Sequence, residues 1–320
     1  MMFNFNWRWM ILHHGNVDSG VIRILTDWML RVLKQRIITA VILIVALIAA
    51  TTLLTPFYFA LVLTPIVLIA AWEWGGFIGL DSREARASYC VTIALMLLGL
   101  FFLLGIGPDV TSLDATRVVT ILLLGLTFWC LSLFVLWGYP DNRDLWNDPS
   151  RIATMGIFSL IPTWIGLVQL KYMQTEGYFL LALIVLVAAV DIGAFFVGSS
   201  FGRRKLAPEL SPKKSWEGVW GGLAACVLLG SGLIWLLHSQ MHALSTIQFV
   251  MLFILTALIT VLSVVGDLLE SMLKRNQAIK DSGAILPGHG GILDRIDGLM
   301  AATPVYVLLV MLMLHYGELA

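Results

Sequence analysis

Long apolar stretches alternate with short polar ones along almost the whole chain. Nine of these stretches are long enough to cross a hydrocarbon layer of about 30 Å. None shows the strict alternation of a membrane β-barrel strand, so each is predicted to be an α-helix. The expected spans are residues 37–54, 57–74, 89–106, 118–137, 152–170, 178–197, 219–237, 249–265 and 299–315. Only Thr55-Pro56 separates the first two.

Composition supports a membrane protein over a soluble one. The chain is 59% hydrophobic and only 12% charged, whereas soluble domains are about 25% charged. We therefore predict an all-α integral membrane protein. The formal net charge of zero gives no reason to expect a nucleic-acid partner. Cys90, Cys130 and Cys226 have neither metal-site nor disulfide spacing, so we interpret them as small buried hydrophobes.

The basic residues predict the orientation of the spans. With nine spans, eighteen of the twenty Lys and Arg residues fall in the N-terminal segment and in alternate loops. Cytoplasmic loops carry the excess of basic residues in membrane proteins. We therefore expect the N-terminus in the cytoplasm and the C-terminus outside. A bacterial inner membrane, with the functional site facing the cytoplasm, is the expected location.

Three regions divide the chain. Residues 1–36 are predicted to be a cytoplasmic segment with an amphipathic helix on the membrane surface. Residues 37–177 contribute the N-terminal membrane helices, and residues 178–320 carry two long polar loops, 198–218 and 266–298. An alternative is that Met29 is the true start. The apolar face of the amphipathic helix would comprise Val21, Ile22, Leu25, Trp28, Met29 and Val32.

Two acidic residues, Glu73 and Asp191, lie inside expected spans. Acids within a membrane are costly, and each is therefore a candidate functional residue. Glu73 is at the end of its span, where we expect a structural role in which it reaches headgroup water. Asp191 is deeper, and for it we favour a functional role.

A polar stripe follows the span at 249–265. Asp267, Glu270, Ser271 and Lys274 are spaced by three and four residues, so they share one face of a helix that continues beyond the membrane. The stripe offers carboxylates for a cation and an ammonium group for an anion. A solvated helix face with internal ion pairs is an equally good interpretation of this stretch alone.

The next segment, "LPGHGGILDRID" at 286–297, gathers chemistry that is rare elsewhere in the chain. Its proline and glycines exclude a helix through 287–291 and let backbone N–H groups approach a phosphate. Asp294 and Asp297 are suited to one face of a helix that enters the last span, and Arg295 can bind phosphate oxygens. His289 could donate to a phosphate or anchor the loop. Carboxylates and bases together favour a site where a divalent cation and phosphates meet during phosphoryl or nucleotidyl transfer.

The earlier loop at 198–218 adds further bases. For Lys213 and Lys214, in "SPKKSWEG", a phosphate-binding role is favoured because Pro212 and its neighbours indicate a shaped loop. Arg203, Arg204 and Lys205 are better explained as ordinary cytoplasmic basicity.

Together these residues resemble the signature of the phosphatidate cytidylyltransferase, or CDP-diacylglycerol synthase, family. The stretches "SPKKSWEGVWGG", "VDIGAFFVG" and "AAWEWGGF" are similar to that family too. The resemblance extends from about residue 29 to the C-terminus, and the extra residues 1–28 are the one departure. The matching positions of the signature are Ser271, Lys274, Arg275, Lys280, Asp281, Pro287, His289, Gly290, Gly291, Asp294, Arg295 and Asp297.

The resemblance implies that CTP and phosphatidate, a membrane lipid, react to CDP-diacylglycerol and pyrophosphate. It implies Mg²⁺, with Mn²⁺ as an alternative and room for a second, monovalent cation; a homodimer is left open. Asp267 and Asp294 would hold the metal and act in catalysis with Lys274 and Asp297, supported by Asp191 and Asp281. The residues that would bind substrate phosphates are Lys213, Lys214, Ser271, Arg275, Lys280, His289 and Arg295.

Two other functions compete with this one. A CTP-dependent polyprenol or phytol kinase would share the fold and the general chemistry, but the His-Gly-Gly-x-x-Asp-Arg-x-Asp detail favours the cytidylyltransferase. A transporter would need charged groups near the membrane midplane. Here the charges gather at one face, which disfavours transport.

Overall fold

The computed structural model describes residues 34, 38–39, 41–240, 246–286 and 290–318. The amphipathic helix expected around 21–32, the alternative start at Met29, and His289 all lie outside these residues.

Within the described residues, eight helices are long and apolar enough to cross a membrane. The first expected span, 37–54, contains a shorter apolar helix, Val41–Leu53, and begins among residues that are not all described. The protein is thus an all-α integral membrane protein, as predicted. The eight helices are α3 (Pro56–Ile78), α4 (Arg83–Leu103), α5 (Ala115–Trp137), α7 (Pro149–Met173), α8 (Tyr178–Phe201), α9 (Trp216–Gln240), α10 (Thr246–Asn276) and α11 (Leu293–Glu318).

The two polar stretches expected to be long loops are mostly regular structure. Residues 198–218 contain the end of α8, an antiparallel hairpin of β1 (Lys205–Ala207) and β2 (Ser211–Ser215), and the start of α9. The Glu217 carboxylate accepts the backbone N–H groups of Arg203 and Arg204, at 3.1 and 3.2 Å, and ties the hairpin to α9. In the second stretch only 277–292 separates α10 from α11.

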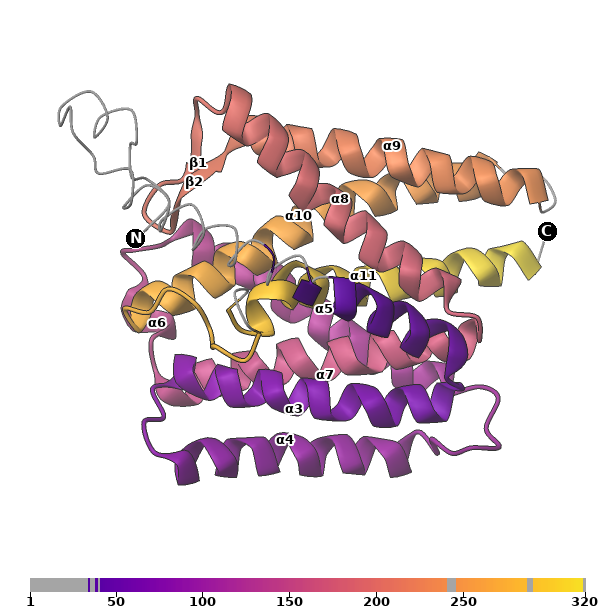
Figure 1. Ribbon diagram of the computed structural model, residues 1–320, viewed down its shortest axis with the longest axis horizontal. Coiled ribbons are helices and arrows are strands. Elements are labelled where there is room, and N and C mark those ends of the chain that lie inside the picture. The colour runs from indigo at the N-terminus through magenta and orange to yellow at the C-terminus, as the bar shows by residue number, and fades with distance from the viewer. Residues whose placement is uncertain (1–33, 35–37, 40, 241–245, 287–289, 319–320) are drawn as a thin grey trace.

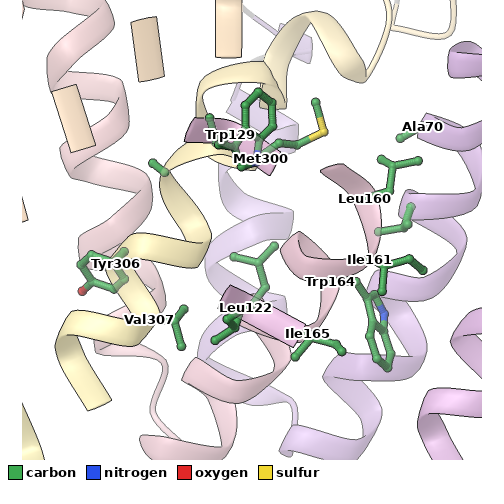
Figure 2. Packing of buried hydrophobic residues seen from close by; sticks show 14 of the residues in the cluster. Ala70, Leu122, Trp129, Leu160, Ile161, Trp164, Ile165, Met300, Tyr306 and Val307 are labelled. Atoms are coloured by element: carbon green, nitrogen blue, oxygen red, sulfur yellow. The ribbon is translucent and has the colours of Figure 1, made fainter. Parts of the chain in front are cut away.

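The apolar core lies around α7, the most deeply buried of the spans. On α7, the indole of Trp164 is fully buried and donates to Thr64 Oγ1 of α3 at 3.2 Å. Figure 2 shows how side chains from α3, α5, α7 and α11 meet there. Its labelled residues are Ala70, Leu122, Trp129, Leu160, Ile161, Trp164, Ile165, Met300, Tyr306 and Val307.

Because successive helices run in opposite directions, their connections gather at two ends of the bundle (Figure 1). One end, at the left of the figure, holds the connections 79–82, 138–148, 202–215 and 277–292, with the short helix α6 (Arg143–Trp146) and the hairpin. We call it the polar end. The connections 104–114 and 174–177 lie at the opposite end. The polar end therefore brings together β2, the end of α10 and the segment 277–292.

Candidate active site

The predicted polar stripe on α10 is confirmed, and it faces the first turn of α11. Lys274 Nζ lies 3.1 Å from Glu270 Oε2 on its own helix and 2.7 Å from Asp294 Oδ1 on α11. The Lys274 and Asp294 side chains are only 16% and 7% exposed, so this is a largely buried ion pair. α11 begins at Leu293, which places Asp294 in its first turn and Asp297 three residues further along the same helix, as predicted.

The second oxygen of Asp294 fastens the segment 277–292. Asp294 Oδ2 accepts the backbone N–H of Ser282 at 2.9 Å, the Ser282 hydroxyl at 3.0 Å and the backbone N–H of Gly291 at 2.9 Å. Both oxygens of the carboxylate are therefore engaged with protein groups. In this arrangement Asp294 shapes the site and orients Lys274, while its predicted role as a metal ligand stays a prediction.

Asp267 is the more open carboxylate. Its side chain is 37% exposed, and its Oδ2 lies 2.5 Å from Nζ of Lys214 on β2. The Ser271 hydroxyl donates to Oδ1 at 3.3 Å. Asp191 of α8 interacts electrostatically with Asp267, Lys214 and Arg295. The hairpin, α8, α10 and α11 thus all contribute charged groups to one place.

Further acidic groups lie close to Asp267. Asp297 interacts electrostatically with Asp267 and is close to the carboxylate of Glu270. Glu270 Oε1 is buried and has no hydrogen-bond partner in the described part of the chain. Carboxylates held this close disfavour each other's ionisation, so either a shared proton or a bound cation would stabilise them. We name this group of residues the polar cluster: Asp191, Lys214, Asp267, Glu270, Ser271, Lys274, Asp294, Arg295 and Asp297.

The chemistry of the polar cluster fits a divalent cation. Hard cations such as Mg²⁺ are held by carboxylate oxygens, and the unsatisfied Glu270 Oε1 is an acceptor that such a charge would satisfy. Among the described residues, no group of three or more His, Cys, Asp or Glu side chains is arranged so that it could hold a metal ion. The carboxylates of Asp267, Glu270 and Asp297 would have to come closer together to hold such an ion.

Several predicted phosphate-binding residues lie outside the polar cluster. Arg275 Nε donates to the carbonyl of Leu210 at 3.4 Å and so links α10 to the hairpin. Lys213 and Lys280 are exposed, as is Asp281, which was predicted to support the site. Within the described residues no hydrogen bond or ion pair joins the three to the cluster. Their predicted roles stay predictions.

Sequence reasoning missed or misjudged three residues. The expectation that Glu73 reaches headgroup water is wrong, because Glu73 is 2% exposed and accepts hydrogen bonds from Ser282, Ile292 and Leu293. Ser282 was not singled out, although its hydroxyl contacts Asp294. Glu270 was placed on the polar stripe but not in the site. Its spacing of four residues from Lys274 was the available signal.

Close approach of α10 and α11 depends on Gly266, the residue before Asp267. A Cβ at Gly266 would lie 2.9 Å from the Asp297 carbonyl carbon and 3.1 Å from Ala301 Cβ. We expect Gly266→Ala to push the two helices apart, to destabilise the protein by about 1–3 kcal/mol and to lower activity. Thermal unfolding in detergent and turnover would measure both effects. Gly99→Ala is the control, since open space surrounds Gly99; equal melting temperatures for the two variants would contradict the prediction.

Comparison with known proteins identifies the family of this chain. A model of the cytidylyltransferase family matches residues 34–313. A phosphatidate cytidylyltransferase of Pseudomonas aeruginosa is 41% identical over 277 residues, covering 87% of this chain and 96% of the relative. One of Haemophilus influenzae is 40% identical, covering 86% and 97%, and one of Thermotoga maritima is 35% identical, covering 55% and 66%. Because the family match spans nearly the whole chain and two relatives match along nearly their full lengths, the chain belongs to the cytidylyltransferase family.

Proposed function

We propose that this protein is a phosphatidate cytidylyltransferase, which transfers the cytidylyl group of CTP to phosphatidate and releases pyrophosphate. The observation that carries the proposal is the polar cluster, where Lys214, Lys274 and Arg295 from three elements surround crowded carboxylates at the end of a membrane bundle. The curated relatives bear this name over most of their length. A site at the end of the bundle suits a reaction between a soluble triphosphate and a lipid phosphate at headgroup level.

The reaction forms one P–O bond and breaks another. A phosphate oxygen of phosphatidate attacks the α-phosphorus of CTP, and the bond from that phosphorus to the bridging oxygen of the β-phosphate breaks. Pyrophosphate leaves with the bonding electron pair. A lipid phosphate is largely ionised near neutral pH, so the protein mainly needs to align the reactants and neutralise charge. Lys214, Lys274 and Arg295 are the positively charged residues placed to neutralise this charge.

A Mg²⁺ ion belongs to this proposal, with Mn²⁺ as the alternative ion and a monovalent cation as a second occupant. When bound, the ion would neutralise charge on the triphosphate. Asp267, Glu270 and Asp297 would hold it, and Asp294 would keep Lys274 and the segment 277–292 in place.

We further propose that the polar end faces the cytoplasm of a bacterial inner membrane. With the nine expected spans, eighteen of the twenty Lys and Arg residues fall in the N-terminal segment and in alternate loops. These loops correspond to the connections at the polar end together with the helix ends beside them. Such an excess marks cytoplasmic loops. CTP would then reach the site directly from the cytosol.

Product analysis with purified protein tests the activity. With CTP, phosphatidate and Mg²⁺ we expect equal amounts of pyrophosphate and CDP-diacylglycerol. Formation of CDP and a phosphorylated lipid alcohol would instead indicate a lipid kinase, and no product from either reaction would contradict the proposal. In sealed vesicles, added CTP should be used only where the cytoplasmic face is outside; use only in the opposite orientation would contradict the topology.

A further inference from the structure

Glu73 is a buried carboxylate that the proposed chemistry does not use. It lies on α3, near the polar end, and its side chain is 2% exposed. Its oxygens accept the backbone N–H groups of Ile292 and Leu293, at 3.0 and 2.9 Å, and the Ser282 hydroxyl at 3.2 Å. All three donors belong to residues more than two hundred positions away in the sequence. Within the described residues, no Lys or Arg forms an ion pair with Glu73.

The bond to Leu293 explains why α11 starts where it does. The first N–H groups of any helix have no partner within the helix, and the N-terminus carries a partial positive charge. Glu73 supplies the missing acceptor and a negative charge from a different helix. It therefore acts as a cap for α11 that the local sequence around 290–293 does not provide.

The chain is packed closely around this carboxylate. A Cβ on Gly283 would lie 2.8 Å from Glu73 Cδ, and a Cβ on Gly291 would lie 2.7 Å from the same atom. These two glycines therefore let the backbone at 282–283 and at 291–293 approach the carboxylate. The close approach of both Gly283 and Gly291 to one side chain indicates that this segment is packed specifically around Glu73.

The Ser282 hydroxyl lies between Glu73 and the polar cluster, and its single proton can be donated to either carboxylate. The Ser282 hydroxyl lies 3.2 Å from Glu73 Oε2 and 3.0 Å from Asp294 Oδ2. Asp294 in turn holds Lys274 at 2.7 Å. Because Leu293 directly precedes Asp294, a shift at the start of α11 would move the Asp294 carboxylate relative to Lys274.

We propose that Glu73 is a positioning residue of the active site: from α3 it fixes the start of α11 and thereby the geometry of the Asp294–Lys274 pair. This inference rests on the proposed function for its kinetic consequence. Its structural consequence, the anchoring of Ser282, Ile292 and Leu293, does not depend on any substrate.

Glu73→Gln is the first test. The amide keeps the shape but offers one acceptor oxygen in place of two, and it turns an N–H₂ group toward backbone donors. We expect kcat to fall roughly 100-fold, the size of effect that follows a small misplacement of reacting groups, with a smaller change in KM for CTP. Hydrogen exchange measured by mass spectrometry should accelerate in 282–293 and stay unchanged in α5 and α7.

Two further variants complete the test. Glu84→Gln makes the same chemical change at an exposed acid on α4, at the same end of the bundle, and should leave rate and exchange at wild-type values. Glu73→Asp keeps the charge and both oxygens and should recover part of kcat and of the exchange protection. If Glu73→Gln behaves like wild type in both measurements, the inference is wrong. It is equally wrong if the loss of activity accompanies faster exchange throughout α5 and α7, which would mark a general structural role.

The failure of this inference differs from the failure of the proposed function. If the wild-type protein makes no CDP-diacylglycerol, the proposed function is contradicted. The hydrogen-exchange experiment then still tests whether Glu73 anchors Ser282, Ile292 and Leu293. If the wild-type protein is active and the Glu73→Gln variant is equally active, only the positioning role is contradicted.

Discussion

Asp294→Asn is expected to lower turnover by at least about 100-fold, within the range observed when a preorganised electrostatic group is removed from an active site. The change removes the charge that holds Lys274 at 2.7 Å. It also leaves Glu270 as the remaining acid that contacts this ammonium group. One oxygen is replaced by an N–H₂ group, which cannot accept from either Lys274 or the backbone donors of Ser282 and Gly291. Pyrophosphate release by purified protein measures the effect.

Part of the cost of Asp294→Asn should fall on stability. Removing one partner of a buried ion pair typically costs about 3–5 kcal/mol, and here the lysine is 16% exposed, which reduces that figure. Thermal unfolding in detergent separates the two effects. Asp81→Asn, at an exposed acid of the same end, should leave both properties unchanged. Turnover equal to wild type in Asp294→Asn would show that the Lys274 pair is not part of the active site.

The helical architecture was largely predictable from the sequence, for a physical reason. Backbone polar groups in a hydrocarbon layer must be satisfied within the helix, so a long apolar stretch leaves few alternatives. The same holds for the polar stripe at 267–274, because its spacing of three and four residues fits only a helix. That stripe lies on α10, which extends to Asn276.

Contacts between distant segments were not predictable. Ion pairing of Lys214 with Asp267 depends on a short hairpin that brings β2 over α10. Glu73 binds backbone N–H groups, which every residue except proline possesses, so its partners leave no trace in the pattern of side chains. An acid inside an apolar span was a signal of importance, but it could not indicate the partner.

The structure also changes how the two predicted metal ligands compare. Asp294 has both oxygens engaged with Lys274, Ser282 and Gly291. Asp267 is more exposed, and its partner Lys214 is itself 22% exposed. Of the two, Asp267 is the carboxylate more readily released to bind an ion, so its substitution should alter metal dependence most directly.

Asp267→Asn is accordingly expected to lower turnover by about 100-fold or more and to raise the Mg²⁺ concentration needed for half-maximal rate. An asparagine oxygen is a neutral and weaker ligand for a hard cation than a carboxylate. The variant should stay folded, because Asp267 is 37% exposed. The measurement is kcat over a series of Mg²⁺ concentrations, with Glu209→Gln, at an exposed acid of the hairpin, as the control. Wild-type turnover of Asp267→Asn at every Mg²⁺ concentration would contradict the assignment.

Lys214→Met, alone and combined with Asp267→Asn, tests whether Lys214 binds substrate or only holds Asp267, from which it lies 2.5 Å away. If Lys214 binds a substrate phosphate once Asp267 turns to the metal, Lys214→Met should raise KM for CTP, and the two substitutions should lower kcat/KM almost independently. If Lys214 acts only by holding Asp267, the double variant should be no worse than Asp267→Asn, because contacting residues that act as a unit are not additive. We expect the first result, since the Lys214 side chain is 22% exposed and therefore accessible to a triphosphate.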